Sequence, residues 1–173
     1  ELASPSKYPP VKLVAKESST ILPEKMATVL GWGKTSTAPS NNGSDVLRQL
    51  EIPIVSNDSC KKAYTGEEPI LDTMVCAGVP EGGKDSCIGD SGGPLVVLEN
   101  NQWKLLGLVS YGGKEKTGGP ICAGPNAYGV YTRISSFMNF ITEHVSFSTP
   151  VNYNGIWQSD SWPNTFFILR SVD

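Results

Sequence analysis

The sequence predicts an all-β fold built from many short strands. Its 173 residues include 18 glycines and 13 prolines, which is too many for a helical protein because glycine weakens helix interiors and proline breaks them. Short runs of apolar residues alternate with polar ones between turn-forming residues, as in half-buried strands. With 39% hydrophobic residues, a chain of this length can bury one core.

The first third of the chain predicts an extended segment followed by two strands. Residues 1–25 contain four prolines, which exclude a long helix. Residues 26–32 are predicted to form a strand, and residues 36–45 a surface loop. Residues 46–55 alternate as a second strand. Its core candidates are Leu47, Leu50, Ile52 and Ile54.

The rest of the chain predicts further strands between two helices. Residues 56–59 form a helix-capping cluster, which predicts a short helix as far as Tyr64. In residues 135–145 an apolar stripe at helical spacing predicts the main helix. That stripe consists of Phe137, Phe140 and Ile141. The predicted strands between the helices are residues 74–78, 95–98, 103–111 and 128–134.

Charge and cysteine content exclude several classes of function. A net charge of −3 offers no basic surface for nucleic acid, and the apolar runs are too short to span a bilayer. The four cysteines allow three disulfide pairings, and the sequence alone does not choose among them. They include no Cys-x-x-Cys pair, so a zinc site is disfavoured, and no metal or cofactor is predicted. The cysteines are Cys60, Cys76, Cys87 and Cys122.

Ser91 lies in a glycine-rich stretch, residues 81–95, directly before the apolar run 95–98. Glycines permit positive φ and let another molecule approach the backbone closely. A serine in this setting can act as a nucleophile while nearby N–H groups stabilise the oxyanion. Taken alone, Gly89-Asp90-Ser91-Gly92-Gly93 favours a polar turn between two strands over a catalytic site, because such turns are common.

The longer segment Asp85-Ser86-Cys87-Ile88-Gly89-Asp90-Ser91-Gly92-Gly93-Pro94-Leu95 closely resembles the active-site segment of the trypsin-like serine endopeptidases of the chymotrypsin fold. Further segments resemble markers of that family in the same order: Gly31-Trp32-Gly33, Cys76-Ala77-Gly78, residues 107–112 and residues 129–133.

The resemblance implies a trypsin-like double β-barrel of which this chain forms the C-terminal barrel. Residues 1–25 would cross over from the first barrel, and residues 26–134 would form a six-stranded barrel with the nucleophile and the primary pocket. Residues 135–145 would be the C-terminal helix. Residues 146–173 extend beyond the family's usual end and are expected to pack on the body or on a partner chain.

The resemblance also implies roles for individual residues. Ser91 would be the nucleophile, with the backbone N–H groups of Gly89 and Ser91 as the oxyanion hole. Asp90 would be buried and would pair with a freed α-amino group. Asp85 occupies the position of the acid at the floor of the primary pocket, which implies cleavage after Lys or Arg. The remaining substrate-binding residues implied are Ser86, Ser110, Tyr111, Gly112 and Gly129.

Two covalent features follow. The resemblance implies disulfides Cys60–Cys76 and Cys87–Cys122, and hence an oxidising, extracellular compartment and a secreted protein. Two Asn-x-Ser sequons predict glycosylation at Asn42 and Asn57.

The chain offers no suitable catalytic base. Its only histidine, His144, lies near the end of the predicted main helix, whereas the family's base belongs to the first barrel. A charge partner for the helix C-terminus is the favoured role for His144. An α/β-hydrolase would need an acid between Ser91 and His144, where only glutamates stand, without βαβ units around them.

We therefore expect an N-terminal chain of the same protease to carry the catalytic histidine and aspartate. Gln49 replaces the cysteine that bridges the barrels in the family, so the two chains would be held noncovalently. The two-chain design and the sequons resemble earthworm-type fibrinolytic enzymes. The predicted function is that of a secreted, trypsin-like serine endopeptidase, possessing no nucleic-acid or membrane partner. The alternative is a catalytically inactive protease-like binding protein.

Overall fold

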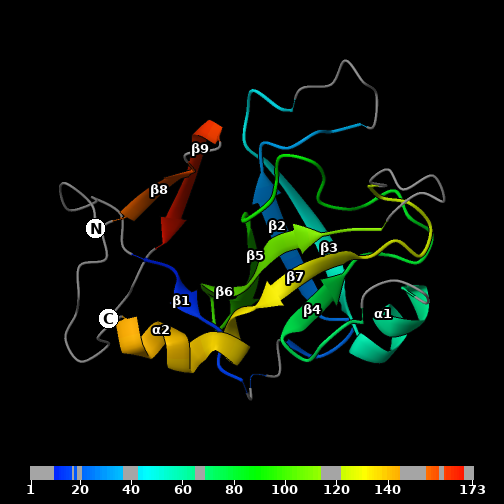
Figure 1. Ribbon diagram of the computed structural model, residues 1–173, viewed down its shortest axis with the longest axis horizontal. Helices are drawn as coiled ribbons and strands as arrows, with labels where there is room; N and C mark the ends of the chain where they lie inside the picture. The colour runs from blue at the N-terminus through cyan, green and yellow to red at the C-terminus, as the bar shows by residue number, and fades with distance from the viewer. Residues whose placement is uncertain are drawn as a thin grey trace.

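The computed structural model describes residues 10–16, 18, 21–36, 43–64, 69–113 and 122–144, and the backbone of residues 155–159 and 162–169. Seven strands form one sheet in the order β1-β6-β5-β2-β3-β4-β7, and β6 also pairs with β7, which closes six of them into a barrel (Figure 1). The strands are β1 (Lys12–Leu13), β2 (Met26–Gly31), β3 (Arg48–Val55), β4 (Met74–Ala77), β5 (Pro94–Glu99), β6 (Gln102–Tyr111) and β7 (Gly129–Arg133). The predicted all-β fold is confirmed.

The barrel interior is filled by alternate residues of its strands. The buried side chains of the main cluster include Ala27 and Val29 from β2, Ile52 and Ile54 from β3, and Tyr131 from β7. This alternation is the consequence of the two-residue period of a β-strand. Three of the four core residues expected near β3 are at least partly buried.

Leu47 is the exception, because its side chain is 50% exposed. β3 begins one residue later, at Arg48. In addition, side chains two residues apart lie on the same face of a strand, so Leu50, Ile52 and Ile54 share the inner face. Leu47 is an odd number of residues away from them and falls on the outer face. The prediction that Leu47 belongs to the core was wrong for this reason.

The segment before the barrel is attached to it by strand pairing. β1 runs parallel to β6, with Lys12 opposite Lys104 and Leu13 opposite Leu105. Val14 follows β1 and is buried in the main cluster. The described part of the crossover segment is thus attached to the edge of β6, near the helix α2 (Figure 1), and Val14 anchors it in the core.

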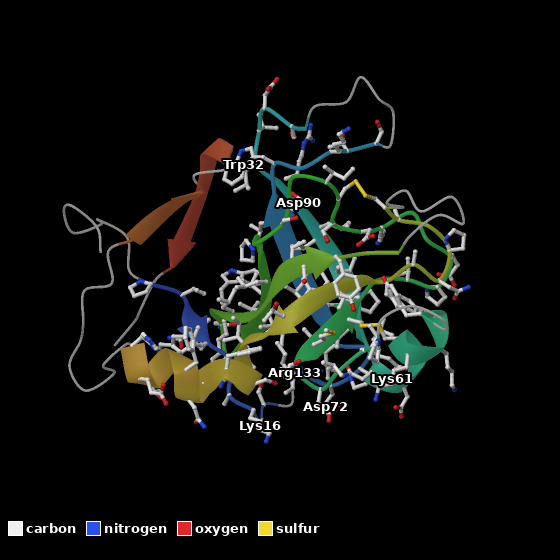
Figure 2. All side chains as sticks on the ribbon, in the orientation of Figure 1. Lys16, Trp32, Lys61, Asp72, Asp90 and Arg133 are labelled. Atoms are coloured by element: carbon white, nitrogen blue, oxygen red, sulfur yellow. A yellow bond between two sulfur atoms is a disulfide. The ribbon has the colours of Figure 1, made fainter. Side chains whose placement is uncertain are left out.

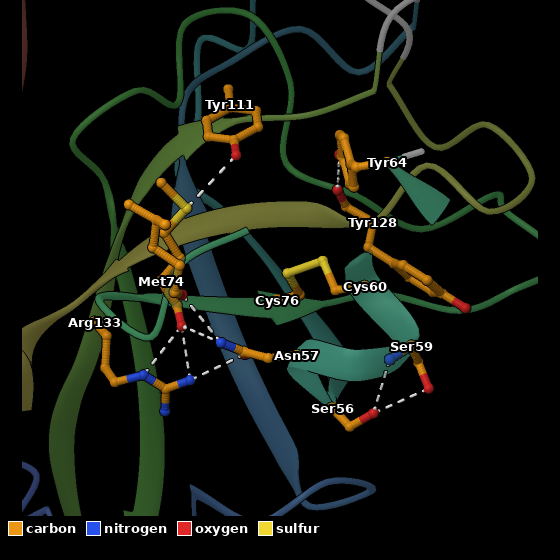
Figure 3. Close-up of a disulfide and its surroundings, with 11 residues drawn as sticks. Ser56, Asn57, Ser59, Cys60, Tyr64, Met74, Cys76, Tyr111, Tyr128 and Arg133 are labelled. Atoms are coloured by element: carbon orange, nitrogen blue, oxygen red, sulfur yellow. Dashed lines mark hydrogen bonds between the residues drawn. A yellow bond between two sulfur atoms is a disulfide. The ribbon is translucent and has the colours of Figure 1, made fainter. Parts of the chain in front are cut away.

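The first helix, α1 (Asn57–Ala63), is capped as predicted. The Oγ atom of Ser56 accepts a hydrogen bond from the N–H group of Ser59 at 3.1 Å. Such a cap satisfies one of the free N–H groups of the first turn. Cys60, in the middle of the helix, forms a disulfide with Cys76 in β4 (Figure 3).

The C-terminal helix is present but faces the barrel differently from the prediction. A 3-10 turn, η2 (Ile134–Phe137), leads into α2 (Met138–His144). Met138 and Ile141 pack against the barrel, whereas Phe140 is 62% exposed. The packed residues Ile134, Met138 and Ile141 follow the i, i+4, i+7 spacing of one helix face. Of the predicted stripe, Ile141 packs against the barrel and both phenylalanines are exposed.

In the extension, β8 (Gly155–Ser159) and β9 (Trp162–Leu169) form an antiparallel hairpin. The side chains of this hairpin lie outside the described residues, so its predicted packing stays a prediction. Within the described part of the chain, no helix has the length and apolarity needed to span a membrane.

Candidate active site

Ser91 lies in the turn that leads into β5, and it is exposed. The turn is fixed on both sides of the serine. The N–H group of Asp90 donates to the carbonyl of Cys87 at 2.9 Å, and that of Gly92 donates to the carbonyl of Val109 in β6 at 2.8 Å. Gly89 and Gly92 have φ angles of +98° and +76°, which other residues rarely adopt. The glycines therefore give the turn a shape that presents Ser91 to solvent.

The N–H groups predicted to bind an oxyanion are free to do so. Among the described residues, those of Gly89 and Ser91 have no hydrogen-bond partner. Their neighbours in the turn, Asp90 and Gly92, are both engaged. Two free N–H groups beside a serine hydroxyl can hydrogen-bond an oxygen that becomes negative during attack.

The side chain of Asp90 is half-buried against the end of β2 and the residues that follow it. Its Oδ1 atom accepts from the N–H group of Gly33 at 2.8 Å, and its Oδ2 atom accepts from that of Cys87 at 2.9 Å. A β-carbon on Gly31 would lie 1.9 Å from Oδ1, and one on Gly33 would lie 2.5 Å from the carboxyl carbon. The carboxylate of Asp90 therefore needs glycine at positions 31 and 33. Figure 2 shows Asp90 close to Trp32, which lies between these two glycines in the sequence.

A cavity of about 400 Å³ opens beside this carboxylate, and Asp90, Gly31 and Gly33 line it. Within the described part of the chain, the single ion pair joins Lys104 to Glu99. No cation of these residues thus pairs with Asp90. A half-buried carboxylate with two N–H donors beside an open cavity can accept a positively charged group from outside.

Asp85 lines another part of the same cavity, which is called the recess below. Its Oδ2 atom accepts from the N–H group of Ala123 at 3.1 Å, while its Oδ1 atom is buried without a hydrogen-bond partner. Burial raises the pKa of Asp85 from 3.8 to about 6, and hydrogen bonds from the backbone of Ala123 and Ser86 offset part of that rise. A buried carboxylate oxygen without a partner is costly, so the recess favours a ligand that brings a cation.

Gly129 keeps the recess open. A β-carbon at this position would lie 2.7 Å from the Oδ1 atom of Asp85 and 2.9 Å from the hydroxyl of Tyr131. That hydroxyl in turn lies 3.2 Å from the Oγ atom of Ser86, and burial raises the pKa of Tyr131. Asp85, Ser86 and Gly129, which were all predicted to bind substrate, are thus brought together. Tyr131 joins them although the sequence analysis did not single it out.

The other predicted substrate-binding residues lie at the end of β6. Ser110 is exposed, and Gly112 directly follows the strand. Tyr111 differs, because its ring packs edge-on against Tyr64 at 6.0 Å and its hydroxyl contacts the sulfur of Met74 at 3.6 Å. Its side chain therefore supports the barrel, and only its backbone remains for contact with an extended peptide.

Both predicted disulfides are present, and no cysteine is free. The Cys87–Cys122 bridge ties the segment of Asp85 and Ser91 to the segment that supplies the N–H group of Ala123. It therefore holds the two sides of the recess together.

His144 does not approach this site. It ends α2, and one nitrogen of its ring lies 2.8 Å from the carbonyl oxygen of Phe140. Figure 1 shows α2 at the opposite end of the barrel from the turn between β4 and β5. The Oγ atom of Ser91 makes no hydrogen bond to the described residues. Among the described residues, His144 therefore offers no base to Ser91.

The two sequons differ in what the structure describes. Asn42 lies outside the described residues. The Nδ2 atom of Asn57 donates to the carbonyls of Leu71 and Met74 at 3.1 and 3.3 Å. A glycosylated asparagine keeps one N–H bond on that nitrogen, so at most one of these hydrogen bonds would survive. Glycosylation of Asn57 stays a prediction.

Within the described residues, no group of three or more acidic, histidine or cysteine side chains is arranged to hold a metal ion. The site is made of a serine turn, free N–H groups and a buried acid in a β-barrel. This is the arrangement expected of a serine-protease chain.

Comparison with known proteins agrees. The family model described as "Trypsin" matches residues 2–141. The chain is similar to a trypsin of Saccharopolyspora erythraea, with 41% identity over 84% of this chain and 57% of that protein. It is also similar to trypsin-1 of Astacus astacus (46%; 65% and 44% covered) and to the clotting factor G beta subunit of Tachypleus tridentatus (43%; 66% and 37% covered).

The chain belongs to the trypsin family. It spans about half the length of the curated relatives it matches.

Proposed function

We propose that this chain supplies the nucleophile, the oxyanion-binding groups and the primary pocket of a secreted serine endopeptidase that cleaves after Lys or Arg. One observation carries the specificity: the Oδ1 atom of Asp85 is buried and unpartnered in a recess that Gly129 keeps open. The ammonium or guanidinium of a substrate would be its missing partner. A neutral side chain would leave the carboxylate unpaired and is therefore rejected.

The reaction is acyl transfer through Ser91. Its Oγ atom attacks the carbonyl carbon of the scissile bond and gives its proton to a histidine base. The N–H groups of Gly89 and Ser91 stabilise the negative oxygen. The base then protonates the leaving amine, which departs and leaves an acyl ester on Ser91 that water hydrolyses with the help of the same base.

The histidine and its aspartate come from a first barrel outside these 173 residues, which we propose is a companion chain. All four cysteines of this chain pair with one another, so a companion would be held without a disulfide to it. The freed α-amino group of the companion would enter the 400 Å³ cavity and pair with Asp90.

The proposal extends to secretion and to a fibrinolytic role. Secretion is supported by the two disulfides, which persist in oxidising compartments. A fibrinolytic role rests on the resemblance of the two-chain design and the sequons to earthworm-type enzymes. Clearing of a fibrin plate by the assembled protease tests that role, and an intact plate would contradict it.

The central test is labelling of the assembled protease with a serine-directed fluorophosphonate. We expect one label on Ser91, none on the Ser91→Ala variant, and much slower labelling of this chain when it is isolated. A peptide library should be cut after Lys and Arg only. If the assembly is neither labelled nor active, the chain is a protease-like binding protein.

A further inference from the structure

A second cavity, of about 540 Å³, lies on the barrel away from the serine turn. Its charged lining residues are Lys16, Asp72 and Arg133. Figure 2 shows these three along one edge of the molecule, with Trp32 and Asp90 toward the opposite edge. The proposed protease mechanism uses none of the residues that line this cavity.

Arg133, the last residue of β7, presents a guanidinium with spare donors to the cavity. Its Nε atom donates to the carbonyls of Asp72 and Met74, each at 3.0 Å. Its Nη2 atom donates to the carbonyl of Met74 at 2.7 Å and to the Oδ1 atom of Asn57 at 3.1 Å (Figure 3). All of these acceptors are neutral. Among the described residues, Nη1 has no partner and no carboxylate pairs with the guanidinium.

Ser135 is a second unused group in the same wall. Its residue is only 9% exposed, and its Oγ atom is buried without a hydrogen-bond partner. Its neighbour Ser136 instead donates to the carbonyl of Asp72 at 3.3 Å. Buried hydroxyls are nearly always hydrogen-bonded, and this one would gain access to a partner in the cavity by rotation about its Cα–Cβ bond.

The balance of charges limits the kind of partner. Lys16 and Arg133 contribute two positive charges and Asp72 one negative charge, which leaves a single net positive charge. Another part of the wall is apolar and includes Ile21 and Ile54. A polysulfated sugar needs a row of cations, whereas one carboxylate on an apolar group matches both the single charge and the apolar wall.

We propose that this cavity is a binding site for a peptide carboxylate carried beside apolar side chains. The carboxylate accepts a hydrogen bond from Nη1 of Arg133 and, once the side chain of Ser135 has rotated toward the cavity, a second one from its Oγ atom. The ammonium of Lys16 lies at the same cavity. The apolar side chains of the ligand pack against Ile21, which is only partly buried. The carboxylate belongs either to the C-terminus or to an acidic side chain of a protein partner, and the test distinguishes these two sources.

The test is an NMR titration of the intact protease with three probes. Acetyl-Leu-Leu carries a terminal carboxylate, acetyl-Leu-Asp-Leu-amide carries a side-chain carboxylate, and acetyl-Leu-Leu-amide is neutral. We expect one or both acidic probes to bind with millimolar affinity and to shift the backbone resonances of Arg133 and Ser135. The neutral probe should bind at least about tenfold more weakly.

Variants assign the binding to this cavity. Arg133→Gln should weaken the acidic probe about tenfold. Arg133 also connects α1 to β4 by hydrogen bonds, so its replacement can weaken binding through a change in structure. Two further variants, Lys16→Ala and Ser135→Ala, do not break these bonds and should each weaken binding about threefold. The matched control is Lys61→Ala, which removes an exposed cation of α1 outside the cavity lining and should change nothing.

Three results would overturn the proposal: equal binding of the neutral probe, binding unaffected by Lys16→Ala and Ser135→Ala, or tighter binding of a sulfated tetrasaccharide than of either acidic peptide. Fluorophosphonate labelling of Ser91 should remain normal in all these variants. Failure of this site is thereby distinguished from failure of the proposed protease function.

Discussion

The carboxylate of Asp85 lies so close to Gly129 that a β-carbon on residue 129 would be only 2.7 Å from its Oδ1 atom. The acid comes from the loop after β4 and the glycine from the start of β7, so the barrel brings together residues that are 44 positions apart (129 minus 85). A side chain at residue 129 would therefore displace the carboxylate of Asp85.

Gly129→Ala tests this relationship. The added methyl group blocks the path to Asp85, so kcat/KM for Lys and Arg substrates should fall about 100-fold. Labelling of Ser91 by a small fluorophosphonate that does not enter the recess should change less than about threefold. Undiminished cleavage after Arg would show that the substrate is bound elsewhere.

The raised pKa of Asp85 predicts a pH-dependent affinity for cations. Below about pH 6 the carboxyl group is protonated and loses its charge. Benzamidine, a small aromatic cation, should therefore bind the assembled protease more weakly as the pH falls through about 6. In Asp85→Asn its affinity should be low and independent of pH over this range, and a persisting pH dependence would implicate another acid.

The same shift predicts how the stability depends on pH. The pKa of Asp85 is higher in the folded chain than its ordinary value of 3.8, so the folded state binds the proton more tightly. The contribution of Asp85 to the free energy of unfolding therefore falls as the pH rises from about 4 to about 6, and it is constant above that. Urea denaturation should find Asp85→Asn more stable than wild type by on the order of 2 kcal/mol at pH 8, and about equal at pH 4. A difference that grows toward low pH would contradict the sign.

Gly31→Ala should disable the serine turn through Asp90. The new β-carbon would lie 1.9 Å from the Oδ1 atom of Asp90, so the carboxylate must move and the turn with it. We expect fluorophosphonate labelling of the assembled protease to fall at least about tenfold. The control is Gly83→Ala, which has open space around it and a φ of +84°. It should cost about 1 kcal/mol of stability and leave the labelling intact.

Removing each disulfide separates stability from specificity. The double variants Cys60→Ala/Cys76→Ala and Cys87→Ala/Cys122→Ala should each lower the free energy of unfolding by about 3 kcal/mol. Only the second should also weaken the preference for Lys and Arg, because the Cys87–Cys122 bridge positions the N–H group of Ala123 against Asp85. Equal specificity in the two variants would show that the bridge does not support the recess.

Local pattern was enough to predict most of the barrel. The strands over residues 26–32 and 74–78 agree with β2 and β4 to within one residue, because alternation and flanking turn residues mark strands locally. The cap at Ser56 followed from its residue type. The parallel pairing of β1 with β6 had no such mark, since two residues are too few to show a period.

The sequence pattern did not predict features that depend on contacts between distant parts of the chain. The last helix has two apolar stripes at helical spacing, and spacing alone does not reveal that the one containing Ile134 and Met138 faces the barrel. Tyr131 was seen only as part of a strand, and its contact with Ser86 joins residues 45 positions apart. Likewise, the need for glycine at position 31 becomes visible only when Asp90 is placed against it.

Tyr131 has one further consequence. Its ring is completely enclosed in the barrel interior, and its hydroxyl touches Ser86 beside the acid that would select the substrate. Efforts to make this protein more heat-resistant by redesigning its interior would thus also alter which peptides it accepts. Conversely, directed evolution of its selectivity at residue 86 would be limited by what the interior tolerates.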